Sequence, residues 1–72
     1  MLEQEAIEIA CDFARQNGLD IELYIKRPKK DEGIWNIYFQ RKSEKYKPAP
    51  GDFFNIYIDD LTKEVQKIVH GE

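Results

Sequence analysis

Residues 55–72 read NIYIDDLTKEVQKIVHGE, and this stretch decides the fold. The i, i+4, i+7, i+8 spacing of an amphipathic helix is met by Leu61, Val65, Ile68 and Val69. The same letters also read as two strands, IYI and VQKIV, joined by a turn, DDLTKE. If this segment were a helix, the sheet would have three strands and its last strand would be a bare edge. If it were a strand, it would pair with that edge and extend the sheet.

Local chemistry favours the strand. Asp and Thr side chains bond to their own backbone and tighten turns. Branching at Cβ disfavours a helix, and this segment holds four such residues: Thr62, Val65, Ile68 and Val69. The helix over residues 61–70 stays the alternative, because Asp59 or Asp60 would cap it and Gly71 would end it.

Upstream of this segment, residues 2–17 have the periodicity of a helix. Its apolar arc is expected to comprise Leu2, Ala6, Ile9, Ala10, Phe13 and Ala14, with Ile7 at the edge. Glu3 and Glu5 suit the positive end of the helix dipole. Asn17–Gly18 supplies a left-handed stop, so we predict that the helix ends there.

Three segments alternate like strands with one buried face. In IELYIKR, Ile21, Leu23 and Ile25 are expected to face the helix, with Tyr24 outward, and Pro28 is expected to end the strand because it cannot donate to a ladder. KKDEG is the expected turn. The next two segments bury Trp35, Ile37 and Phe39, and then Phe54, Ile56 and Ile58. A loop, SEKYKPAPG, separates these two.

The predicted fold is α+β: one N-terminal helix on a four-stranded antiparallel sheet in the order α-β-β-β-β, as a single domain of residues 1–72. A chain this short buries only about 60% of the surface that its unfolded form exposes, so dimerisation stays open. One cysteine, Cys11, forbids an internal disulfide and favours a reducing compartment. No apolar run has the length of a membrane span, and the first residues are acidic, so we expect a soluble cytoplasmic protein without a membrane partner.

The net charge of −3 is unevenly distributed. Residues 1–25 carry six carboxylates against Arg15 alone, whereas residues 26–47 carry eight Lys and Arg against three carboxylates. Such a dipole can orient an encounter with a charged partner, but it names none.

Three segments together carry a resemblance to known domains. IYIDDLTKEV resembles a hairpin of PepSY-like domains and of small cystatin-like immunity proteins of bacterial toxin systems. GIWNIYFQ resembles their Trp-containing strand, and AIEIACDFARQNG resembles their leading helix. Lys63 stands where those families usually have Gly, and there it would need a left-handed backbone. The resemblance implies an intracellular binding domain, and one option is an immunity protein that occupies a toxin. It carries over no catalytic residue.

Residues able to carry chemistry are few. His70 and Cys11 lie at opposite ends of the chain. We expect His70 to be solvated at the end of a strand and Cys11 to be a small buried hydrophobic residue. Asp59–Asp60 could form an acid–base pair or hold a metal, but a turn that needs Asp explains them better. Neither a phosphate-binding loop nor metal-ligand spacing is present. We therefore predict a protein without catalysis, cofactor or metal.

Binding is the more informative prediction, and it concerns the sheet face opposite the helix. That face is expected to show Tyr24, Tyr38, Phe53 and Tyr57. Aromatic residues favour strands in any case, so simple pairing across strands is the alternative explanation. As a flat aromatic platform, the same residues would bind a protein partner, since Tyr is enriched at binding hot spots.

Two further surfaces enter the prediction. Glu5, Glu8 and Asp12 form an acidic ridge on the helix, either solvated or used to steer toward a basic partner such as a toxin. The sheet tyrosines with basic loops would instead make a nucleic-acid-binding module. We judge nucleic acid the weaker alternative, because Lys26–Lys30 and Arg41–Lys47 are expected at opposite ends of a hairpin.

Overall fold

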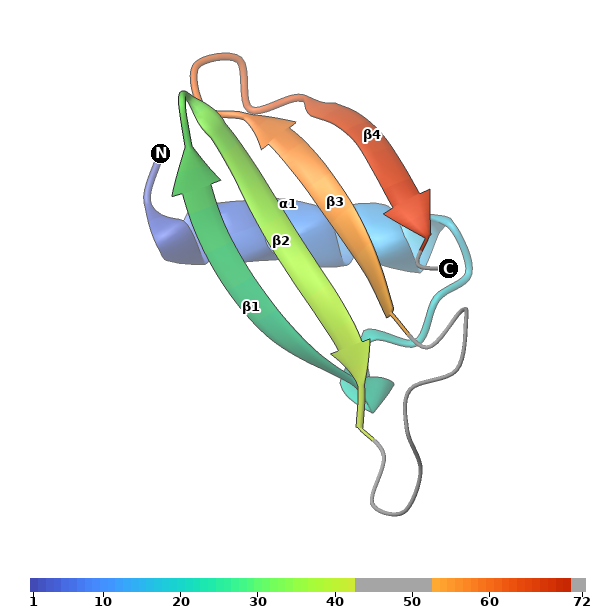
Figure 1. Cartoon of the computed structure of the whole chain (residues 1–72). Helices are drawn as coiled ribbons and strands as arrows, with labels where there is room; N and C mark the ends of the chain where they lie inside the picture. The colour runs from blue at the N-terminus through green and yellow to red at the C-terminus, as the bar shows by residue number, and fades with distance from the viewer. Residues whose placement is uncertain (43–52, 71–72) are drawn as a thin grey trace.

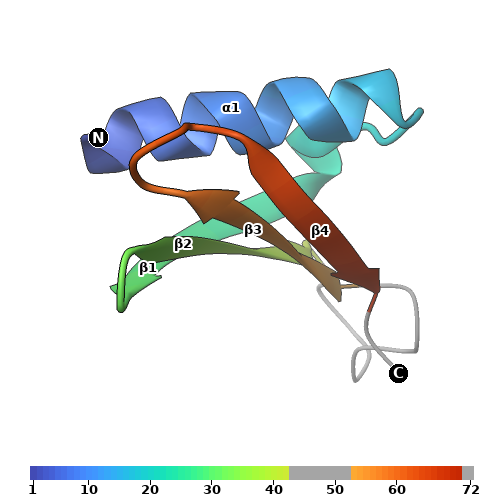
Figure 2. The ribbon, with the colours of Figure 1, turned by 90° about the horizontal axis from the view of Figure 1, so that it is seen from above.

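One helix lies across one face of a four-stranded antiparallel sheet in the computed structural model, which describes residues 1–42 and 53–70 (Figures 1 and 2). The elements are helix α1 (Glu3–Gln16), the short 3-10 helix η1 (Ile21–Leu23), and strands β1 (Tyr24–Asp31), β2 (Ile34–Arg41), β3 (Phe53–Asp59) and β4 (Val65–His70). The strands lie side by side in chain order. The predicted α+β fold is confirmed. The predicted loop at 43–51, with Lys45 and Lys47, lies outside the described residues, as does Gly71.

Small residues let α1 approach the sheet closely. Ala6, Ala10 and Ala14 are fully buried, and larger side chains such as Ile9 and Phe13 pack around them. Leu2 differs from the prediction: it precedes the helix in an extended conformation and is 79% exposed. The helix ends as predicted, because Gly18 has a φ of 81° and its N–H donates to the Arg15 carbonyl.

The prediction for the start of β1 was wrong for Leu23, Tyr24 and Ile25, whereas Ile21 is buried as predicted. Residues 21–23 form η1, which Asp20 caps by accepting a hydrogen bond from the Glu22 N–H, and the strand begins only at Tyr24. Tyr24 is therefore buried, with its ring edge-on to Phe39 and Phe54 at centroid distances of 6.3 and 5.1 Å. Leu23 and Ile25, both predicted inside, are the exposed ones.

Pro28 also does not end β1. The strand continues to Asp31 and pairs with β2 throughout, with Pro28 opposite Ile37. An edge strand tolerates Pro, because its N atom can face away from the ladder. The turn is shorter than KKDEG: only Glu32 and Gly33 separate the paired residues Asp31 and Ile34, and both have positive φ, at 49° and 80°. Positive φ at both central residues is the signature of a type I′ hairpin turn.

The core is centred on β2 and β3, as the sequence predicted. Trp35, Ile37 and Phe39 alternate inward from β2, and each pairs with an inward residue of β3. The Phe39 and Phe54 rings stack with centroids 4.6 Å apart. α1 covers most of this buried face, and Ile21 of η1, with Met1 and Leu19, packs on the same core.

Residues 55–70 form a hairpin of β3 and β4. The predicted strand after the turn is therefore confirmed, and the alternative of a helix over residues 61–70 is wrong. Asp59 Oδ1 accepts hydrogen bonds from the N–H groups of Leu61 (2.8 Å) and Thr62 (3.0 Å), which closes the turn. Lys63 has a φ of 63°, the left-handed backbone that the sequence comparison with Gly implied. The chain then returns as β4.

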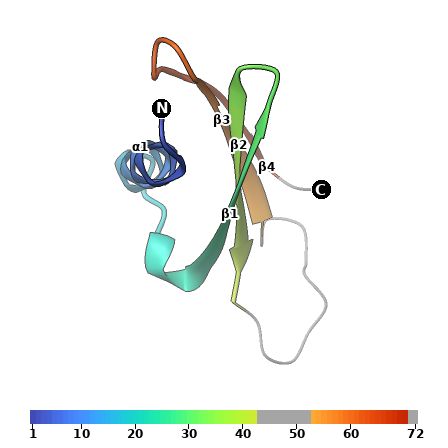
Figure 3. The ribbon, with the colours of Figure 1, turned by 90° about the vertical axis from the view of Figure 1, so that its left-hand side faces the viewer.

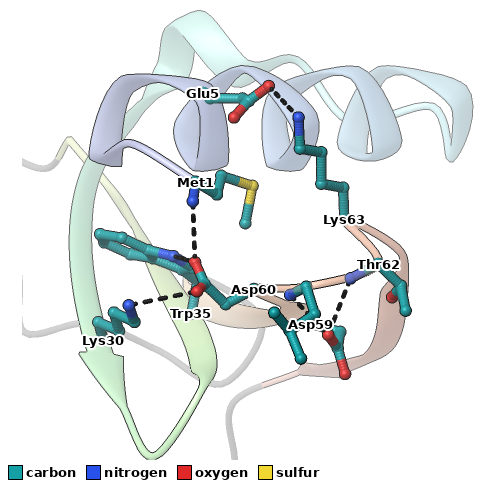
Figure 4. A network of polar contacts seen from close by, with 9 residues as sticks. Met1, Glu5, Lys30, Trp35, Asp59, Asp60, Thr62 and Lys63 are labelled. Atoms are coloured by element: carbon teal, nitrogen blue, oxygen red, sulfur yellow. Dashed lines mark hydrogen bonds and ion pairs between the residues drawn. The ribbon is translucent and has the colours of Figure 1, made fainter.

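Asp60 joins this turn to the rest of the molecule (Figure 4). Its Oδ1 accepts a hydrogen bond from Trp35 Nε1 at 2.8 Å and lies 3.3 Å from the Met1 ammonium group. Its Oδ2 lies 3.3 Å from Lys30 Nζ. The Asp60 N–H donates to the Gly33 carbonyl, which ties the two hairpin turns together. The indole hydrogen bond and the Lys30 ammonium lower the pKa of Asp60.

Candidate binding face

The sheet face opposite α1, here called the open face, is not covered by any described element (Figure 3). Side chains alternate along each strand, so this face is shown by the residues between the buried positions. Three aromatic residues gather there from β2 and β3, and we call them the aromatic cluster: Tyr38, Phe53 and Tyr57. All three are half-buried.

Cross-strand pairing fixes the geometry of the aromatic cluster. Tyr38 and Phe53 are diagonal neighbours, because Phe53 lies two residues from Asn55, the register partner of Tyr38; their ring centroids are 6.0 Å apart and the rings are tilted by 48°. Tyr57 pairs with Lys67 of β4, whose Nζ lies 4.9 Å from the ring centroid, a cation–π distance. Tyr24 is not part of this surface, so the prediction that placed four aromatic residues on the open face holds for three.

Aliphatic residues extend the cluster to both edges of the sheet. Ile25 on β1 and Val69 on β4 are each 42% exposed. Sequence reasoning missed both, because Ile25 was assigned to the core and the facing of β4 was left open. The register of β1 against β2 was the missing information: Ile25 pairs with Gln40, an open-face residue.

A hollow of about 470 Å³ lies on the open face beside Tyr57. Lys29, Asn36, Tyr57 and Lys67 line it and are consecutive neighbours across the four strands. Asn36 Oδ1 is buried there without a hydrogen-bond partner among the described residues. Buried acceptors are almost always satisfied, so this oxygen is suited to accept a donor from outside the chain.

The sequence predicted the basic residues of β1 at one end of the hairpin, but they are spread along the strand. All four lie within β1 and alternate between the two sides of the sheet. Arg27 and Lys29 stand on the open face, in register with Tyr38 and Asn36. Lys26 and Lys30 point to the helix side, where Lys30 meets Asp60.

The acidic ridge lies on the other side of the molecule, because α1 covers the opposite face of the sheet (Figure 3). Two of its three carboxylates are paired within the chain: Glu5 Oε2 lies 3.0 Å from Lys63 Nζ, and Asp12 Oδ1 lies 2.8 Å from Arg15 Nη1. Glu8 is exposed. A flat partner surface therefore cannot contact the ridge and the open face together.

The residues considered for catalysis are placed apart. Cys11 is a buried residue of α1 itself, and burial raises the pKa of its thiol. His70 is exposed at the end of β4, as expected. Asp59 and Asp60 do not converge: Asp59 closes its own turn, and Asp60 reaches Trp35.

Neither a metal-binding cluster nor a membrane-spanning helix is found among the described residues. No group of three or more His, Cys, Asp or Glu side chains in residues 1–42 and 53–70 is placed to hold a metal ion. Over the same residues, no helix combines the length and apolar character that crossing a membrane requires.

Comparison of the chain with family models, with curated proteins and with solved structures found no match.

Proposed function

We propose that this chain is a non-catalytic protein-binding domain, of the immunity or inhibitor type, that receives its partner on the open face. The observation that carries the proposal is the aromatic cluster on a sheet face that no described element covers (Figure 3). Tyr combines a large apolar ring with a hydroxyl group and loses little conformational entropy on binding, which is why it is enriched at hot spots.

The composition of the open face supports a protein partner. Apolar and aromatic side chains run across it from Ile25 to Val69. Charged residues of both signs, Arg27, Lys29 and Asp31, lie along β1 at one edge. Protein interfaces have this arrangement, with an apolar aromatic centre and a polar rim.

The hollow beside Tyr57 adds a specific polar contact. Asn36 Oδ1 has lost water without gaining a partner in the described chain. A donor on the partner that reaches this oxygen would remove the cost of leaving a buried acceptor unpaired. Lys29 and Lys67 line the same hollow together with Asp31 and Glu32, so charges of both signs surround this acceptor.

The acidic ridge has a secondary role in this proposal. Glu5 and Asp12 already have cationic partners, so they offer less uncompensated charge than the sequence suggests. The helix can still steer a basic partner such as a toxin at long range, because steering depends on the summed field of the molecule. Close contact is assigned to the open face.

A second candidate function has one observation in its favour. Arg27 and Lys29 stand beside Tyr38 and Asn36 on the open face, so cations and aromatic rings interleave there. Single-stranded nucleic acid is bound by such combinations of stacking and positive charge. Asp31 and Asp59 also belong to this face and would repel phosphates, which makes protein the better candidate.

Affinity capture from the host lysate tests the proposal when it compares variants. The tagged wild type, a Tyr38→Ser/Tyr57→Ser double variant and a Leu61→Ser control are each used with and without nuclease and read by mass spectrometry. Leu61 is 90% exposed on the turn between β3 and β4, away from the aromatic cluster, so its variant also removes an exposed apolar side chain.

We expect one protein at a stoichiometric level with the wild type and with Leu61→Ser, retained after nuclease and lost with the double variant. Equal capture by the double variant would remove the open face from the account. Captured material that disappears with nuclease would favour the second candidate function.

A further inference from the structure

The two edges of the sheet differ in how they resist pairing with another strand. β1 carries Pro28, which lacks an N–H donor, and four cationic side chains: Lys26, Arg27, Lys29 and Lys30. Proline and lysine on an edge are common devices against edge-to-edge association. β1 is therefore a protected edge.

β4 carries fewer of these devices, although its pairing with β3 shifts register between Tyr57 and Ile58. Its six residues contain no proline and three β-branched side chains, Val65, Ile68 and Val69, and Lys67 is its one Lys or Arg. No described strand pairs with its outer side. An edge of this kind is a template for a further strand.

Side chains next to this edge are only partly covered. Val69 is 42% exposed on the open face, and Ile68 packs against the core from the other face while staying half-buried. A strand added outside β4 would cover both side chains. It would also satisfy the outward N–H and C=O groups of the strand.

We propose that the occupant is a second copy of this chain, paired antiparallel through β4 about a two-fold axis at Ile68. This axis sets Ile68 against Ile68 of the copy and Lys67 against Val69, so within β4 no like charges are opposed. A register centred on Lys67 would set two ammonium groups against each other, which is unfavourable. The isologous contact closes on itself.

The proposed dimer stops growing for a reason that the sheet itself supplies. After β4 has paired with β4, the free edges of the joined sheet are the two β1 strands, which Pro28 and the cations protect. Both helices lie on one side of the joined sheet, and the two open faces form one surface on the other side. The dimer does not depend on the proposed function, since a monomer also presents the open face.

Sedimentation velocity over a range of protein concentrations tests the dimer with a set of charge variants. Val69→Lys sets two lysines opposite each other across the axis, and we expect it to raise the dimer dissociation constant at least about ten-fold. Val69→Glu faces Lys67 of the copy and should keep the dimer. Val69→Lys combined with Lys67→Glu should restore it.

Ile25→Lys is the matched control, because Ile25 has the same 42% exposure on the open face but lies on the protected edge. It should leave the dissociation constant unchanged. Unfolding curves for every variant show that each one is folded. A wild type that sediments as a monomer at all concentrations overturns the proposal, as does an equal effect of Val69→Lys and Ile25→Lys. Neither result changes the capture expected of the Tyr38→Ser/Tyr57→Ser variant, so the two proposals fail separately.

Discussion

Trp35 on β2 and Asp60 in the turn after β3 are joined by a hydrogen bond of 2.8 Å from the indole Nε1 to Oδ1 (Figure 4). Trp35 is 8% exposed, so its N–H has little access to water as a substitute. Asp60→Ala leaves this donor unpaired and removes the carboxylate that Lys30 approaches. We expect a lower urea midpoint of unfolding. Far-UV circular dichroism measures it, because this signal reports the backbone and does not depend on Trp35.

A double-mutant cycle with Trp35→Phe isolates the hydrogen bond. In the Phe background, Asp60→Ala should lower the midpoint less, because no indole donor remains to be left unpaired. Equal losses in the two backgrounds would show that Asp60 acts through its other contacts.

The two turn carboxylates make stability depend on pH. The indole of Trp35 lowers the pKa of Asp60, and the N–H groups of Thr62 and Leu61 lower the pKa of Asp59. In the unfolded chain both carboxyl groups have the ordinary pKa of 3.8. As the pH falls through about 4, the unfolded state takes up protons first, so the free energy of unfolding decreases; above about pH 5 these groups add no slope.

Urea midpoints measured from about pH 2.5 to 6 check this expectation. Asp60→Asn should flatten the acid side of the profile relative to the wild type. An unchanged profile would mean that other carboxylates cause the acid sensitivity.

Lys63 has a left-handed backbone with a φ of 63°. Lys63→Gly and Lys63→Ala both remove the ammonium group that lies 3.0 Å from Glu5, so their difference reports the backbone alone. We expect the Gly variant to be more stable by about 1 kcal/mol, because a Cβ is strained in this conformation. The same pair of substitutions at Lys29, inside β1, should give the opposite order. Ala above Gly at Lys63 would contradict the backbone assignment.

Tyr24 is buried and Ile25 is exposed, which is the reverse of what the alternation of the sequence predicted. Tyr24→Ala removes a buried ring that contacts Phe39 and Phe54, and we expect a loss of about 3 kcal/mol or more. Ile25→Ala, at a 42% exposed position, should cost about 1 kcal/mol or less. Urea unfolding of both variants decides the matter, and the reverse order would restore the original facing of β1.

Much of the fold was predictable because several local signals agreed. The apolar arc of the helix, the Gly18 stop and the alternation in β2 and β3 each point to one structure. The C-terminal hairpin was harder, since β-branched residues and Asp–Thr turn chemistry had to outweigh a helical spacing. The turn chemistry expected from the sequence is present in the structure, where Asp59 Oδ1 accepts hydrogen bonds from the N–H groups of Leu61 and Thr62.

The facing of β1 was not predictable from alternation alone. Apolar residues at 21, 23 and 25 share one period, but η1 breaks the strand at Leu23 and shifts the buried set to Tyr24. The facing of β1 is decided by tertiary contacts, because the Tyr24 ring packs against two Phe rings that come from β2 and β3. The same shift brings Ile25, Arg27 and Lys29 to the open face, so the candidate site was predicted only in part.

Covalent labelling of tyrosines in the captured complex tests the central claim most directly. Tyr38 and Tyr57 lie on the open face, whereas Tyr24 is 8% exposed and serves as an internal control in the same chain. The account predicts that Tyr38 and Tyr57 react in the free protein and become protected in the complex, while Tyr24 stays unreactive in both. If both tyrosines react equally with and without the partner, the open face is not the binding surface.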